Sequence, residues 1–175
     1  MKAPDTIRIA LTCADDSLAV MTYVVREYNA DESVRMEQGT EISDIEREIE
    51  RLSAGFDPEK RPVKSWRVIK AYEIPDDRSF RNAWRDRGRI EVDMPAARAI
   101  HLERVRAART GKLNALDREW MRATGQGKKA EADAVEAKRQ RLRDLPSTLL
   151  MDTAETPDDL KTLWDNELGA MQDYT

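Results

Sequence analysis

The chain has 175 residues, of which 40% are hydrophobic and 37% are charged, and its net charge at pH 7 is −4. This length favours one compact domain with an appendage over two full domains. A charged fraction well above the usual share of about 25% excludes a deep globular core and favours exposed helices that bury a narrow apolar stripe.

The charge is unevenly distributed along the chain. Residues 98–143 hold 13 Lys and Arg against 6 Asp and Glu, whereas residues 144–175 hold 8 acids and one base, Lys161. The first thirty residues show no targeting leader, and no apolar run approaches the roughly 18 residues of a membrane span. The single cysteine, Cys13, cannot form an internal disulfide and is expected to be buried at a strand end. These features predict a soluble protein made in a reducing compartment.

The first part of the chain predicts a small antiparallel sheet. Alternating polarity and β-branched residues indicate a strand over residues 6–12, and turn residues at 14–17 separate it from a second strand. The further predicted strands are residues 18–28, 34–37 and 65–72.

Two helices are predicted beside this sheet. Ser43 and Glu46 fit a capping box that opens an amphipathic helix over residues 43–54, with Ile45, Ile49 and Leu52 facing the sheet. Pro58 and Pro62 delimit the loop that follows. Asp76 or Asp77 is expected to cap a short helix that carries Phe80, Ala83 and Trp84 and ends at Gly88.

The second half of the chain predicts an antiparallel helical hairpin. Asp93 as the cap and Pro95 in the first turn open a helix from Met94 to about Thr124. Gly111 leaves a bend in this helix as an alternative. Residues 124–127 form the reversal, and a second helix over residues 128–144 is ended by Pro146. Thr156-Pro157 opens a short terminal helix with Leu160, Leu163, Trp164 and Leu168, followed by an acidic tail.

The predicted fold class is therefore α+β: a small N-terminal antiparallel sheet with one packed helix, a long helical hairpin and a short C-terminal helix. We expect an α+β domain at residues 1–90, the hairpin at 91–146, and an acidic C-terminal segment at 147–175.

Catalytic and metal-binding patterns are not found in the sequence. The only histidine, His101, lies among arginines in the long helix, where we expect a helix-flank position rather than a triad or zinc ligand. Gly125 to Lys128 suits a hairpin turn better than an anion site, and pairs such as Asp76-Asp77 sit where turns and caps explain them. We therefore expect no enzyme activity, no cofactor and no small-molecule substrate.

Large apolar residues and a basic series are the candidate contact sites. Phe80 and Trp84 are expected to tie the β part to the hairpin, Leu116, Trp120 and Leu142 to anchor the hairpin, and Trp164 to contact another chain. The basic series is Arg98, Arg104, Arg106, Arg109 and Lys112. It leaves nucleic-acid binding open as an alternative, but the pI near 5.3 favours contact within the chain or between copies.

Several blocks of the sequence resemble small proteins encoded among the tail and tail-fibre genes of tailed phages and prophages. The likeness spans residues 60–165 and is carried by Ser65-Trp66-Arg67-Val68-Ile69, Asp77-Arg78-Ser79-Phe80-Arg81-Asn82-Ala83-Trp84, Val92-Asp93-Met94-Pro95-Ala96-Ala97-Arg98, Arg104-Val105-Arg106-Ala107-Ala108-Arg109 and Leu142-Arg143-Asp144. The resemblance implies a role in the virion or its assembly. It carries no active-site residues with it.

Four functions follow from these observations. The first is a virion structural protein of the tail, neck or fibre apparatus, made in the host cytoplasm and held in a homo-oligomer or symmetric assembly with other phage structural proteins, away from membranes. The alternatives are a tail-fibre assembly chaperone absent from the mature particle, a nucleic-acid-binding protein, and an enzyme of unrecognised type.

Overall fold

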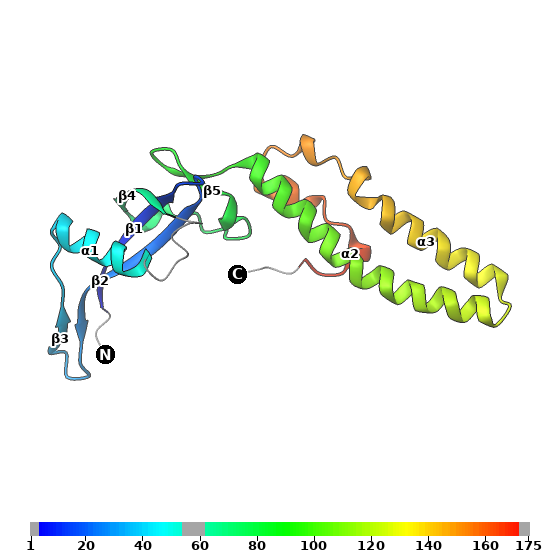
Figure 1. Cartoon of the computed structure of the whole chain (residues 1–175), viewed down its shortest axis with the longest axis horizontal. Coiled ribbons are helices and arrows are strands. Elements are labelled where there is room, and N and C mark those ends of the chain that lie inside the picture. The colour runs from blue at the N-terminus through cyan, green and yellow to red at the C-terminus, as the bar shows by residue number, and fades with distance from the viewer. Residues whose placement is uncertain (1–3, 54–61, 172–175) are drawn as a thin grey trace. The chain divides into compact units, whose positions relative to one another are not determined.

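The computed structural model of the chain describes residues 4–53 and 62–171 (Figure 1). The chain forms two compact units, Met1–Val92 and Asp93–Thr175, and each is described by itself. The first unit holds an antiparallel sheet and the second is helical, which confirms the predicted α+β class. Residues 147–171 pack with the hairpin in the second unit.

The sheet of the first unit has four antiparallel strands in the order β3-β2-β1-β4. The strands are β1 (Asp5–Cys13), β2 (Leu18–Tyr28), β3 (Val34–Glu37) and β4 (Val63–Ile69). The central β1 pairs Ile9 with Met21 on one side and with Val68 on the other. The predicted strands are confirmed, except that β4 ends at Ile69 and residues 71–72 of the predicted strand belong to a 3₁₀ turn; Cys13 is buried at the end of β1 as expected.

One face of the sheet is covered by helix α1 (Ile42–Ser53). Ile45 and Ile49 of the helix pack against Ile9 and Met21, because alternate residues of a strand point to the same face. The helix begins at Ile42, so Ser43 lies inside it and the predicted cap position is wrong. The side chain of Leu52 and the loop containing Pro58 lie outside the described residues.

The opposite face is covered by a β-hairpin rather than by the predicted short helix. This hairpin consists of β5 (Trp84–Asp86) and β6 (Ile90–Val92), and it follows two 3₁₀ turns, η1 (Ala71–Glu73) and η2 (Arg81–Ala83). Gly88, expected to end a helix, instead has φ +88° in the turn of this hairpin. Trp84 and Ile90 pack on Ala10 of the sheet, and this burial outweighs the local preference for helix.

An ion-pair cluster fixes this hairpin to the sheet. Arg67 of β4 donates from Nε to Asp86 at 2.6 Å and from Nη1 to Glu73 at 2.7 Å. The side chain of Asp86 is 8% exposed and that of Arg67 is 32% exposed. The two hydrogen-bonded carboxylates raise the pKa of the Arg67 guanidinium, which therefore keeps its charge.

The second unit is built on a hairpin of α2 (Met94–Gly125) and α3 (Lys129–Thr148). The Asp93 side chain accepts a hydrogen bond from the Ala96 amide at 3.3 Å, and Pro95 lies in the first turn, so the predicted helix start is confirmed. Helix α2 continues through Gly111. Gly127, at φ +71°, lies in the reversal.

Pro146 does not end α3, and this prediction is wrong. The helix continues to Thr148. A proline at position 146 cannot donate to the carbonyl of Leu142 four residues earlier. Arg109 of α2 compensates for part of this loss, since its Nη1 donates to the Arg143 carbonyl at 2.8 Å and lies 3.5 Å from the Leu142 carbonyl.

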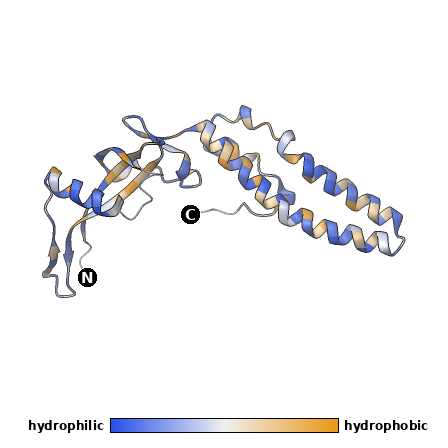
Figure 2. Ribbon diagram, in the orientation of Figure 1, coloured by the Kyte–Doolittle hydropathy of each residue, from blue (hydrophilic) through white to orange (hydrophobic). Residues whose placement is uncertain are grey.

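The C-terminal segment contains the predicted short helix, which is capped by Thr156 and begins at Pro157 as expected but ends at Thr162, before Leu163, Trp164 and Leu168. It contains η3 (Met151–Thr153), α4 (Pro157–Thr162) and η4 (Asn166–Leu168). Gly169, at φ +85°, follows the last turn. Leu168 packs with Val105, Leu142 and Leu145 in the core of this unit. Figure 2 shows that α3 is mostly hydrophilic, which agrees with the narrow apolar stripe expected for the hairpin.

Candidate functional site

The two aromatic residues at the start of the β-hairpin region, Phe80 and Trp84, lie in the interior. Phe80 is 1% exposed, and Trp84 is 5% exposed within the core that also holds Ala10, Ile69 and Ile90. Trp84 therefore anchors β5 to the sheet of its own unit.

The apolar candidates of the second unit also pack within their own unit. Leu142 is buried, and Leu116 packs against the same cluster. The Arg139 guanidinium lies over the ring of Trp120, 5.3 Å from its centroid. The half-buried Trp164, expected to contact another chain, donates from Nε1 to the Gly169 carbonyl at 2.7 Å.

The basic series does not form one phosphate-binding face. Arg98 donates to the Ala154 carbonyl at 2.8 Å, Arg109 donates to α3, and Arg106 pairs with Glu103. Arg104 is half-buried, and Lys112 is exposed. Two of these five cations thus bind carbonyls elsewhere in their own unit and a third pairs with an acid of its own helix, which disfavours the nucleic-acid alternative.

His101 is fully buried, so the expected helix-flank position is wrong. Its ring meets Trp164 edge-on at a centroid distance of 5.8 Å. Burial, and to a smaller extent the charge of Arg104, lowers the pKa of the imidazole. The sequence did indicate that His101 is buried, because Ala97, His101 and Val105 are spaced four residues apart and therefore lie on the same side of α2.

The described part of the chain holds neither a metal-binding cluster nor a membrane-spanning helix. Within residues 4–53 and 62–171, no three His, Cys, Asp or Glu side chains are grouped so that they could hold a metal ion. None of the helices described there combines the length and the apolar character needed to cross a membrane.

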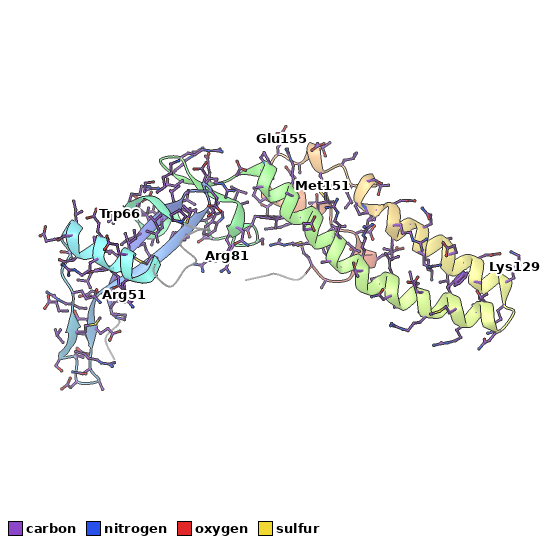
Figure 3. The ribbon with its side chains drawn as sticks, in the orientation of Figure 1. Arg51, Trp66, Arg81, Lys129, Met151 and Glu155 are labelled. Carbon is purple, nitrogen blue, oxygen red and sulfur yellow. The ribbon has the colours of Figure 1, made fainter. Side chains whose placement is uncertain are left out.

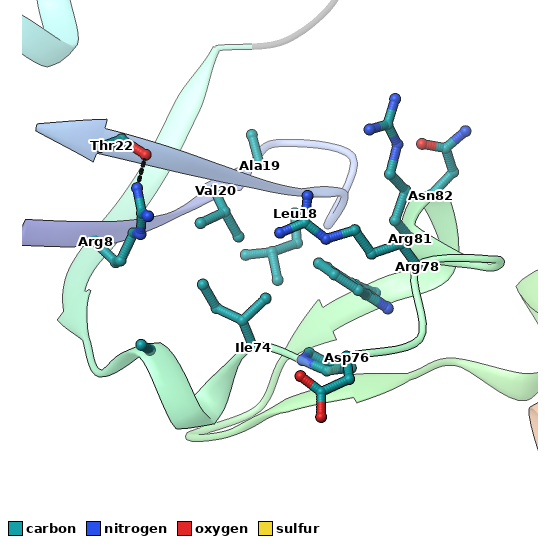
Figure 4. Close-up of a pocket in the computed structure, with 13 residues that line it drawn as sticks. Arg8, Leu18, Ala19, Val20, Thr22, Ile74, Asp76, Arg78, Arg81 and Asn82 are labelled. Carbon is teal, nitrogen blue, oxygen red and sulfur yellow. Dashed lines mark hydrogen bonds between the residues drawn. The ribbon is translucent and has the colours of Figure 1, made fainter. Parts of the chain in front are cut away.

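A groove of about 720 Å³ lies on the outer face of the sheet, opposite α1 (Figure 4). Leu18, Val20 and Thr22 of β2 form one wall, and the segment from Ala71 to Trp84 forms the other. Its charged lining residues are Arg8, Asp76, Arg78 and Arg81. The volume lies within the range of about 300–1,000 Å³ that is usual for binding pockets.

The groove has an excess of positive charge. Arg8 donates to the hydroxyl of Thr22. Neither Arg78 nor Arg81 forms an ion pair or side-chain hydrogen bond with any residue that the structure describes, and both are exposed. Figure 4 shows Arg78 extending across the groove toward Leu18. Two cations at this groove are thus available to an anionic partner.

Sequence reasoning did not find this groove. Its walls come from residues 18–22 and 71–84, which only the sheet and the β-hairpin bring together. The polar block at residues 76–82 was interpreted as a helix start, where acids and arginines need no further explanation.

A second surface lies at the far end of the hairpin. Trp120, Thr124 and Ala132 line a shallow recess of about 290 Å³ beside the reversal, near Lys129 (Figure 3). Met121, next to Trp120, is 58% exposed. This tip presents apolar atoms on an otherwise charged arm.

Comparison with known proteins identifies no relative. No family model, no curated protein and no solved structure matches the chain.

Proposed function

We propose that this protein is a non-enzymatic structural subunit of the tail or fibre apparatus of a tailed phage. It is made in the host cytoplasm, takes its place in the virion and acts through protein–protein contacts. The sequence blocks that resemble phage proteins support this proposal through their packing. Arg67 binds Asp86, Trp84 pairs with Val92, and Arg109 binds the Arg143 carbonyl. The resemblance therefore concerns a packed scaffold rather than scattered surface residues.

The observation that carries the proposal is the two-helix arm. Helix α2 has 32 residues and is about 48 Å long at 1.5 Å per residue. The C-terminal segment packs along its first part, where Arg98 reaches Ala154 and His101 meets Trp164. Figure 1 shows the hairpin continuing beyond this segment as two helices alone. The outer sides of such an arm can contact neighbouring polypeptides.

The tip of the arm is suited to such a contact. Interface cores are enriched in aromatic residues and Met and depleted of charge. Trp120 is held in place because Arg139, which stacks on it, is fixed by ion pairs to Asp117 at 2.7 Å and to Glu136. Met121, the next residue of α2, is exposed at the same end of the arm, so the tip offers a preorganised aromatic ring and an exposed Met to a partner subunit or a second copy.

Mass spectrometry of purified phage particles tests the proposal. A structural subunit appears there at a fixed stoichiometry with the other tail proteins. A protein that copurifies with fibre protein from lysate but is missing from particles is an assembly chaperone instead. Absence from both contradicts the proposal.

A variant of the tip tests the arm itself. Met121→Glu places a charge in the proposed contact and is expected to lower incorporation into particles, while the free energy of unfolding stays unchanged because the side chain is exposed. The matched control is Asn114→Glu, an exposed position on the same helix. Equal incorporation of both variants contradicts the assignment of the tip.

A further inference from the structure

We propose that the groove on the outer face of the sheet binds an extended, acidic segment of a partner polypeptide alongside β2. The inference rests on the proposed function as a protein-contact subunit and adds the chemistry of the partner. Three features carry it: an open strand edge, an apolar floor and unpaired arginines.

The open edge belongs to β2. Strand β1 pairs with β2 from Leu18 to Arg26, but on the other side β3 pairs only with Arg26–Tyr28. Among the described residues, no strand pairs with Leu18 to Val24 on that side. Unpaired amides and carbonyls of an edge strand are a template for an added strand.

The groove reaches the backbone of this part of β2. Ala19 and Val20 both line it, although neighbouring residues of a strand point to opposite faces. The groove therefore touches the strand itself and not only the side chains of one face. Leu18 and Thr22 are four residues apart, so this wall is about 13 Å long at ~3.3 Å per residue, which matches a short extended segment.

The lining selects the side chains of that segment. Leu18, Val20 and Ile74 offer apolar contacts, while Arg8, Arg78 and Arg81 face a single acid, Asp76. A segment paired with β2 points alternate side chains toward the groove, so acidic residues at those positions can place their carboxylates against the guanidinium groups, while the apolar residues between them point away from the groove. Trp84 is only 5% exposed and offers no stacking platform, so the groove fits a polypeptide better than a single-stranded nucleic acid.

Fluorescence anisotropy with the full chain tests the inference. The probe is a labelled peptide of alternating Val and Glu, and its partner control carries Lys in place of Glu. The Glu peptide is expected to bind and the Lys peptide to fail. The double variant Arg78→Glu/Arg81→Glu is expected to weaken binding at least about tenfold, because two attractions become repulsions. The matched control is Arg118→Glu, an exposed arginine on α2.

Two further measurements test the pairing with β2. A Glu peptide that is N-methylated at alternate residues loses backbone donors and is expected to bind much more weakly. Hydrogen exchange at the amides of Leu18 to Val24 is expected to slow when the unmodified peptide binds. Hydrogen exchange elsewhere in the sheet also shows whether the double variant is folded.

Equal binding of the Glu and Lys peptides overturns the inference. So does unchanged binding by the folded double variant or by the methylated peptide, and so does displacement of the peptide by excess single-stranded DNA. If the chain is present in particles but binds no peptide, the groove inference fails while the proposed function stands. If it binds the peptide but is missing from particles, only the proposed function fails.

Discussion

Acidification between pH 7 and pH 5.5 is expected to destabilise the second unit through His101. The imidazole is fully buried beside Trp164, and its pKa is lowered, so the folded state favours the neutral ring. An unfolded histidine takes up a proton near pH 6.5. Because the unfolded state binds this proton more readily, the stability contributed by His101 is present above pH 6.5 and lost as the pH falls below it.

The size of the effect follows from this linkage. If the folded ring stays neutral, protonation of the unfolded state lowers the free energy of unfolding by about 1.3 kcal/mol between pH 7 and pH 5.5. The carboxyl groups whose pKa values are lowered, such as Glu48, Glu73 and Asp159, act at more acidic pH, because their unfolded pKa values lie near 4 to 4.5. The pH interval thus isolates the histidine.

Urea denaturation followed by tryptophan fluorescence measures this effect. His101→Phe is expected to abolish most of the pH dependence over this interval. The control Leu142→Ala removes a buried side chain from the same unit and is expected to cost about 2–5 kcal/mol at every pH while keeping the slope. An unchanged slope in His101→Phe, or a stability that rises on acidification, refutes the reasoning.

Two further predictions concern buried cations. Arg67→Met leaves the nearly buried carboxylate of Asp86 without its partner and is expected to lower the free energy of unfolding by about 2–3 kcal/mol. The loss is smaller than for a fully buried pair because Arg67 is one-third exposed. The control Arg26→Met breaks an exposed pair and should cost under about 1 kcal/mol, so equal losses in the two variants refute the prediction. Arg109→Met is expected to lower the free energy of unfolding by about 1–2 kcal/mol, and by less in a Pro146→Ala background, where residue 146 regains its backbone amide donor. Strictly additive losses in a double-mutant cycle contradict this compensation.

Several features of the fold were predictable from local signals in the sequence. Period-two alternation predicted the sheet, and Asp93 with Pro95 fixed the start of α2, because these signals act over a few residues. Local signals also predicted the helical hairpin and its reversal at residues 124–127, which the structure places between Gly125 and Lys129. The high charged fraction predicted a thin apolar stripe, which a two-helix arm requires.

Tertiary structure decided the elements whose local signals were ambiguous. The block from Asp76 to Gly88 suits a helix locally, but burying Trp84 against the sheet draws it into a hairpin. Pro146 normally stops a helix, but Arg109 from the facing helix supplies a donor to the neighbouring carbonyls. We expected the basic series to form a contact surface, but two of its arginines donate hydrogen bonds to carbonyls 34 and 56 residues away along the chain. The groove forms only when β2 and the segment after η1 meet, because residues distant in sequence combine their charge and apolar area only once packing brings them together.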